Sequence, residues 1–178
     1  LALGADGPAM TYVTELPGCT FGSPGPGGAS GGGYTMGWAF VPTQPVTVTA
    51  LGFPDTGAPG FILDHTIHLW NQSRSVVRSV TAFAGPEPGG VMGLNGYRYY
   101  AITPIVLNAG EQYTIGVGLP AVGDTTAPSD TVYNLACTTT ISFDPRITWL
   151  GGRLSGSLNQ FPGQSFPLNS ETSRSTTG

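Results

Sequence analysis

Apolar and polar residues alternate along short segments of this chain, and Gly or Pro separates one segment from the next. Period-two alternation in β-branched and aromatic residues predicts half-buried antiparallel strands. No window has the 3.6-residue periodicity of an amphipathic helix. The predicted strands cover residues 10–16, 37–40, 46–51, 66–70, 75–80, 97–102, 112–117, 131–136, 138–143 and 146–150.

This spacing of short strands predicts an all-β fold, an antiparallel β-sandwich of jelly-roll type with long Gly/Pro-rich loops. The chain has 178 residues, enough for one sizeable core. We expect residues 1–33 to form an N-terminal arm with a Gly/Pro-rich linker, and residues 34–169 to form the sandwich. Residues 170–178 are a Ser/Thr-rich tail.

Charge is scarce, and this narrows the classes of partner. Only 9% of the residues are charged, all six basic residues are Arg, and the net charge is -4. Nucleic acid and anionic lipid are therefore not expected as partners. No apolar stretch has the length that a membrane-spanning helix needs. A surface of Ser, Thr, Asn, Gln and Gly suits polymers, glycans or another copy of the same chain.

Cys19 and Cys137 are the only cysteines, and neither belongs to a CxxC or His/Cys ligand motif. Two interpretations compete, a single disulfide in an oxidising compartment or two unrelated thiols. The low charge and the many Gly, Ser and Thr residues favour an extracytoplasmic protein, and hence the disulfide. We therefore expect a secreted or cell-surface protein.

The N-terminal arm has two interpretations. Met10, Tyr12, Val13 and Leu16 lie in a strand-like segment that a Gly/Pro/Ser-rich stretch over residues 22–33 separates from the next strand. The segment is either an ordinary first strand of the sheet or an arm that completes the sheet of a neighbouring copy.

Aromatic residues are the candidate ligand-binding groups, since their rings can stack on sugars. Trp38 and Phe40 share one face of a predicted strand, and we expect that face to belong to the core. Trp70, Tyr97, Tyr99 and Tyr100 are the candidates for ligand binding. The strand with the three tyrosines carries aromatic rings on both faces, so it is either central in the sandwich or pressed against another subunit.

The ionisable residues form no catalytic pattern. His65 and His68 are three residues apart, so a strand places them on opposite faces, and we expect one to be exposed and one packed. Asp55 and Asp64 border a turn-rich loop and are weak candidates for Ca²⁺ ligands, although Asp also favours turns by itself. The acids lie mostly in loops, which does not suggest a glycosidase pair. We expect no enzyme activity and no cofactor.

The order of these segments resembles the β-sandwich domain of secreted bacterial proteins that carry a PEP-CTERM sorting tail, and the related family DUF4082. The resemblance covers roughly residues 34–168, but the given sequence shows no C-terminal Pro-Glu-Pro motif followed by an apolar helix and a basic tail. It implies an extracellular, often polysaccharide-associated protein, and it supplies no catalytic residues. The matching segments are 34–40, 46–53 with Asp55, 64–70, 97–99, 104–116, 147–153 and 161–162.

Two hypotheses about function follow. The first is a non-enzymatic structural or surface-matrix protein that self-associates into an oligomer or filament, with the N-terminal strand as a candidate donor. Scarce charge supports it, because few like charges oppose the pairing of sheet edges. The alternative is a carbohydrate-binding module of an extracellular polysaccharide-associated protein, which would use the exposed aromatic rings.

Overall fold

All regular structure in the described part of the chain is β-strand. The computed structural model describes residues 2–5, 11–13, 34–54, 61, 63–85, 89–92, 97–119, 144–155 and 169–171. The predicted strands at 131–136 and 138–143, both cysteines and the Gly/Pro-rich stretch at 22–33 lie outside these residues. Within them, no helix is long and apolar enough to cross a membrane.

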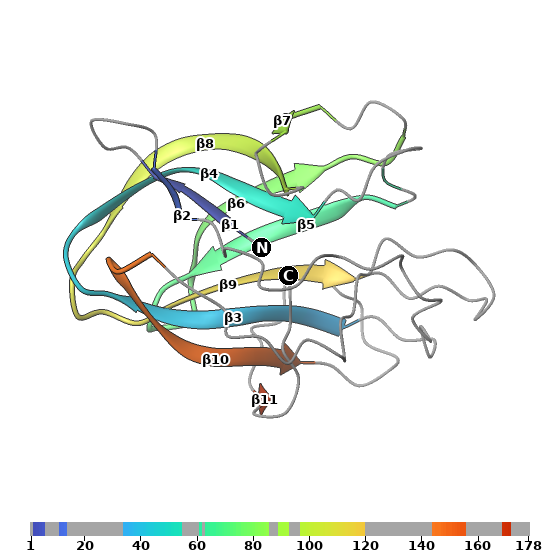
Figure 1. Cartoon of the computed structure of the whole chain (residues 1–178). Helices are drawn as coiled ribbons and strands as arrows, with labels where there is room; N and C mark the ends of the chain where they lie inside the picture. The colour runs from blue at the N-terminus through green and yellow to red at the C-terminus, as the bar shows by residue number, and fades with distance from the viewer. Residues whose placement is uncertain are drawn as a thin grey trace.

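In the described part of the chain, eleven strands form two antiparallel sheets (Figure 1). The five-stranded sheet has the order β2-β1-β4-β8-β7, and the six-stranded sheet has the order β11-β10-β3-β9-β5-β6. The strands are β1 (Ala2–Ala5), β2 (Thr11–Val13), β3 (Tyr34–Pro42), β4 (Val46–Pro54), β5 (His65–Trp70), β6 (Val76–Ala82), β7 (Val91–Met92), β8 (Tyr97–Leu107), β9 (Tyr113–Leu119), β10 (Ile147–Ser155) and β11 (Asn169–Glu171).

The chain crosses repeatedly from one sheet to the other, as in jelly-roll sandwiches. β3 and β4 are consecutive in the sequence but belong to different sheets, and so do β4 and β5, β6 and β7, and β8 and β9. Every strand pair is antiparallel. The antiparallel β-sandwich that the sequence predicts is therefore confirmed.

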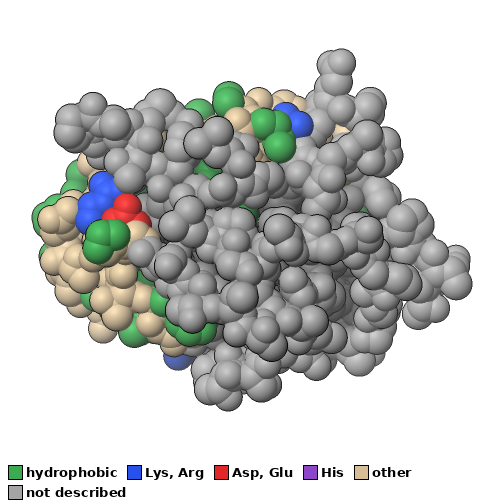
Figure 2. Space-filling view, in the orientation of Figure 1, with side chains coloured by type: hydrophobic (Ala, Val, Ile, Leu, Met, Phe, Trp, Pro, Cys, Tyr) green, Lys and Arg blue, Asp and Glu red, His purple; other side chains and the backbone are tan. Residues whose placement is uncertain are grey.

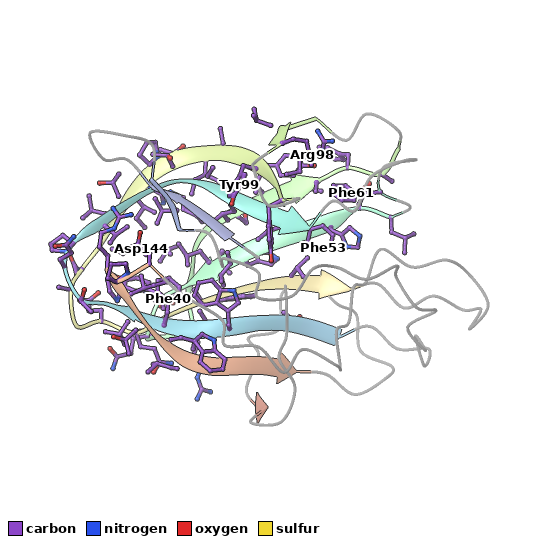
Figure 3. All side chains as sticks on the ribbon, viewed as in Figure 1. Phe40, Phe53, Phe61, Arg98, Tyr99 and Asp144 are labelled. Atoms are coloured by element: carbon purple, nitrogen blue, oxygen red, sulfur yellow. The ribbon has the colours of Figure 1, made fainter. Side chains whose placement is uncertain are left out.

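The core lies between the sheets and is built from alternate residues of the long strands. Trp38 and Phe40 are buried there with their ring centroids 4.9 Å apart, as the sequence predicts for that face of β3. Phe53 and Phe61 pack edge to face at one end of the sandwich, and Asp144 lies at the opposite end (Figure 3). The other buried members of the core are Val46, Val48, Leu51, Ile67, Leu69, Ala82, Tyr100, Leu107, Tyr113, Ile115, Val117 and Ile147.

Three short strands, β1, β7 and β11, have no counterpart in the sequence prediction, whereas β2 lies within the predicted strand at residues 10–16. β1 and β2 lie within residues 1–33 and join the five-stranded sheet, while β11 reaches residue 171 and pairs with β10. The two sheets thus extend past residues 34–169, the range expected for the sandwich. β1 has the sequence Ala-Leu-Gly-Ala, which carries no alternation, and its strand conformation depends on pairing with β4.

Candidate assembly edges and binding faces

The N-terminal hairpin of β1 and β2 extends the five-stranded sheet at the edge of β4. β1 pairs with β4, and β2 pairs with β1 so that Tyr12 lies opposite Gly4. Of the predicted arm residues, Tyr12 and Val13 belong to the outermost strand, whereas Met10 and Leu16 lie outside the described residues. Within one chain, the arm strand is therefore an edge strand of its own sheet.

β4 is paired with another strand along both of its edges over much of its length. It pairs with β8 on one side, and β1 covers the part between Val48 and Gly52 on the other. Proline would interrupt such an edge, because it has no N–H to donate. Pro45 precedes β4 and Pro54 is its last residue, so the middle of the edge keeps all its donors.

β6 ends the six-stranded sheet, and Arg78 in its middle reaches across to the other sheet. The Arg78 Nε donates to the carbonyl oxygen of Thr103 at 2.7 Å, and Nη2 donates to that of Pro104 at 3.1 Å. Nη1 donates to the carbonyl oxygen of Val77 in the same strand at 2.6 Å. One guanidinium thus satisfies three backbone acceptors and joins β6 to β8.

An irregularity in β8 provides two of these acceptors. Along the β4–β8 ladder, Val48 lies opposite Ile105 but Ala50 lies opposite Ala101, so β8 has extra residues at this point. Such a bulge disrupts the ladder locally and re-aims backbone groups. The carbonyls of residues 103 and 104 in this segment accept from β6 instead.

The four aromatic candidates for ligand binding are buried, and only Tyr97 and Tyr99 lie together. Tyr100 belongs to the core, while Tyr97 and Tyr99 pack on the opposite face of β8 with their ring centroids 6.5 Å apart. Trp70 is buried in the other sheet. Trp149 on β10 is 41% exposed, so it is the tryptophan whose ring is accessible. β8 carries buried aromatic rings on both faces, as the sequence predicts, and lies between β4 and β7.

The face of the six-stranded sheet that points away from the core combines small residues of β3 and β9 with His68 and Trp70 of β5. Gly37 of β3 lies opposite Gly116 of β9, which lies opposite His68 of β5. In the next row, Thr114 lies opposite Trp70. All five residues are buried. The six-stranded sheet is therefore buried on both faces in this region, and its glycines allow close packing there.

The two histidines lie on opposite faces of β5, but both are buried, so the expectation that one is exposed is wrong. His65 stacks on Phe53 with the ring centroids 4.4 Å apart. His68 lies against Trp70 with the centroids 5.2 Å apart. The error has a physical cause: burial of the outward face of β5 is a tertiary property that alternation along one strand does not reveal.

The structure gives Asp64 a local backbone partner. Its Oδ1 accepts from the backbone N–H of Ala84 at 2.6 Å, and Gly85 N–H donates to the carbonyl oxygen of Phe61 at 2.7 Å. Asp64 thus extends the pairing beyond the β5–β6 hairpin, while Asp55 lies outside the described residues. Among the residues that the structure describes, no three His, Cys, Asp or Glu side chains form a metal-binding group.

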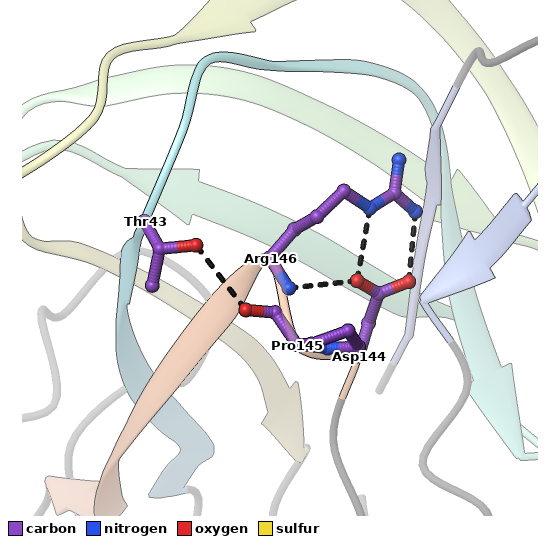
Figure 4. Close-up of polar contacts among 4 residues, drawn as sticks. All are labelled: Thr43, Asp144, Pro145 and Arg146. Atoms are coloured by element: carbon purple, nitrogen blue, oxygen red, sulfur yellow. Dashed lines mark hydrogen bonds and ion pairs between the residues drawn. The ribbon is translucent and has the colours of Figure 1, made fainter.

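One end of the six-stranded sheet is held by a compact set of polar contacts (Figure 4). Asp144 accepts from the Arg146 backbone N–H at 2.8 Å and forms a two-pronged ion pair with the Arg146 guanidinium. The Thr43 N–H donates to the carbonyl oxygen of Arg146, and its Oγ1 donates to that of Pro145. Hydrogen bonding from Arg146 is the main cause that lowers the pKa of Asp144.

Comparisons of the chain with models of protein families, with curated proteins and with solved structures found no match. The interactions described above therefore carry the functional argument. Sequence reasoning missed Arg78 and the Asp144–Arg146 pair. In the sequence, Arg78 stands out as the one charged residue in a segment rich in Val and Thr. A charged residue inside an edge strand is one of the ways in which proteins keep such strands from pairing.

Proposed function

We propose that this chain is a non-enzymatic structural protein of an extracellular surface or matrix, and that its copies associate by exchanging the β1–β2 hairpin. The observation that carries the proposal is the position of β1. It pairs through a main-chain ladder of four residues with the side of β4 that faces away from β8, and with β2 it forms the end of the five-stranded sheet. A hairpin from a second copy makes the same ladder.

The connection between the hairpin and β3 is long enough for exchange. Residues 14–33 separate β2 from β3, and Gly and Pro dominate their composition. A Gly-rich coil of about 20 residues spans roughly 25 Å. This distance is comparable with the width of a small sandwich, so β1 can reach the β4 of an adjacent copy. When each copy donates its hairpin to the next, the assembly remains open and grows into a filament.

Donation of a strand suits a chain with little charge. A donated strand gains main-chain hydrogen bonds along the whole edge, so association does not need a large apolar patch. In the space-filling view, few charged side chains appear among the described residues that face the viewer (Figure 2). β4 itself contains no Lys, Arg, Asp or Glu that would oppose an incoming strand. The composition and the resemblance in strand order support the extracellular setting.

The test uses cysteines placed across the β1–β4 ladder, where Gly4 lies opposite Ala50. One sample of the chain carries Gly4→Cys and a second carries Ala50→Cys. After the two are mixed, partly unfolded and refolded, we expect a disulfide between chains that peptide mapping assigns to positions 4 and 50. The matched control carries both substitutions in one chain at high dilution, where the disulfide forms within the chain.

A truncation provides a second readout. Deletion of residues 1–16 leaves β3 to β11 in place, and we expect a folded sandwich that no longer assembles. A synthetic peptide of residues 1–16 then binds the truncated protein at the vacated β4 edge. If the mixed cysteine variants never cross-link between chains and the full chain stays monomeric at every concentration, hairpin exchange is excluded. Failure of the truncated protein to fold would identify the hairpin as an obligatory internal element.

A further inference from the structure

The second long edge of the sandwich is β6. Four strands end the two sheets, and β6, with seven residues, is longer than β2, β7 or β11, which have two or three. Among the strands that the structure describes, it pairs with β5 on one side and with none on the other. An end strand of this length presents unpaired N–H and C=O groups that can pair with another chain. β6 contains no Pro, and four of its residues are Val or Thr.

The side chains at both ends of β6 suit a contact with a second copy. Val76 is 45% exposed at the start of the strand, and Phe83, directly after its last residue, is 62% exposed. An antiparallel pair of two β6 strands centred on Ser79 places Val76 of one copy opposite Ala82 of the other. In the same register Phe83 lies opposite Ser75 of the other copy, on the other face of the pair from Val76. Each copy therefore covers part of one apolar side chain on either face.

Arg78 opposes this pairing. In the register centred on Ser79, Arg78 lies opposite Val80 of the other copy, and the two Arg78 side chains are diagonal neighbours on the same face. A register centred on Arg78 puts the two guanidinium groups directly opposite each other. Like charges at such positions destabilise a ladder. β6 has no acidic residue that would neutralise them.

Arg78 is also held in place. It lies opposite Leu69, which is fully buried, so it points toward the inner side of the edge. Its three hydrogen bonds to the carbonyls of Val77, Thr103 and Pro104 fix the guanidinium between β6 and β8. Because the carbonyl of Val77 belongs to β6 itself, one acceptor of the edge strand is already occupied.

We propose that β6 is a latent edge for pairing with β6 of a second copy, and that Arg78 keeps this edge closed. Inward-pointing charges are one of the devices that prevent edge-to-edge pairing in β-proteins. The consequence is that association is restricted to the β4 edge. This inference concerns a different edge from the hairpin exchange and does not depend on it.

The test places a reporter cysteine at Ser79, an exposed residue at the centre of the expected pair. Three chains are compared: Ser79→Cys alone, Ser79→Cys with Arg78→Ala, and Ser79→Cys with Arg98→Ala. Arg98 is the matched control, because it is also a strand arginine that donates to a backbone carbonyl, that of Gly89 at 3.0 Å. Arg98→Ala changes the net charge by the same amount as Arg78→Ala. Peptide mass mapping separates a 79–79 disulfide from any bond of Cys19 or Cys137.

We expect the rate of 79–79 cross-linking to rise at least tenfold with Arg78→Ala and to stay unchanged with Arg98→Ala. Arg78→Met keeps the length of the side chain and removes the charge, so it should behave like Arg78→Ala. Arg78→Lys keeps the charge and should leave the edge closed. Equal cross-linking in all chains overturns the proposal. Loss of the folded state in both Arg78→Ala and Arg78→Met also overturns it, because Arg78 would then be required for the fold itself.

Discussion

Arg78 and Thr103 join the two sheets of this sandwich by a hydrogen bond of 2.7 Å from the guanidinium Nε to the backbone carbonyl oxygen. The residues are 25 positions apart and belong to different sheets. The same guanidinium also donates to Pro104 and Val77. Arg78 therefore supplies hydrogen-bond donors to the backbone carbonyls of the irregular segment of β8, and it connects the two sheets at one side of the sandwich.

This relationship predicts the effect of Arg78→Ala on stability. Hydrogen bonds to charged groups contribute about 1.5–3 kcal/mol, and the carbonyls lose their donor. We expect the free energy of unfolding in urea to fall by roughly 2 kcal/mol. Arg98→Ala, which removes the hydrogen bond to the carbonyl oxygen of Gly89 and no contact to the six-stranded sheet described above, should cost less. Equal losses in the two variants would show that the contacts between the sheets contribute nothing specific.

Gly37 should tolerate no larger residue. A Cβ built at this position would overlap the carbonyl oxygen of Ile115 and would lie 2.6 Å from the Gly116 Cα. Gly37→Ala must therefore push β3 away from β9, and we expect a cost of about 3 kcal/mol. Gly110→Ala is the control. Gly110 has a φ of +79° with open space around it, so Ala there costs only about 1–2 kcal/mol of backbone strain. Thermal or urea unfolding of both variants measures the difference, and a smaller loss for Gly37→Ala would contradict it.

The Asp144–Arg146 pair predicts a pH-dependent contribution to stability. Hydrogen bonding from Arg146 holds the pKa of Asp144 below its usual value of 3.8 in the folded state. The stabilisation is therefore fully present above the unfolded pKa and is lost as the pH falls through the lower folded pKa. Asp144→Asn should cost about 1–2 kcal/mol at pH 7, and the cost should shrink steadily at acid pH. A cost that is independent of pH would assign the effect to the backbone contact of Asp144 alone.

Tyr113 links the β8–β9 turn to the sheet. Its hydroxyl accepts from the Asn108 N–H at 3.1 Å and donates to Glu111 Oε2 at 2.7 Å. Tyr113→Phe should reduce the free energy of unfolding by about 1 kcal/mol. Burial is the main cause that raises the pKa of Tyr113 above its usual 10.0, so ionisation is disfavoured in the folded state.

The sign of this shift predicts the alkaline behaviour. A raised folded pKa gives stability that is complete below pH 10 and is lost as the pH rises through the folded pKa. The advantage of the wild type over Tyr113→Phe should therefore decrease above pH 10. Urea unfolding at a series of alkaline pH values measures it. Parallel stability curves for the two proteins would contradict the prediction.

The alternation along single segments determined most of the long strands and the faces they bury. Residues 46–51 and 112–117 were predicted as strands, and β4 and β9 contain or overlap them. The burial of Trp38 and Phe40 was equally predictable, because in a strand side chains two residues apart share a face. These are local properties, since the period of a strand is set by the backbone of that strand alone.

The tertiary structure decided everything that depends on neighbours distant in the sequence. β1 forms a strand because the edge of β4 supplies hydrogen bonds, although its own sequence carries no strand pattern. His68 and Trp70 are buried because the face of the six-stranded sheet away from the core is also covered. Arg78 is a connector between sheets because a bulge in β8 turns two carbonyls toward it. A sequence pattern records which side chains of one strand share a face, but strand order, edges and contacts between sheets arise only when distant segments pack together.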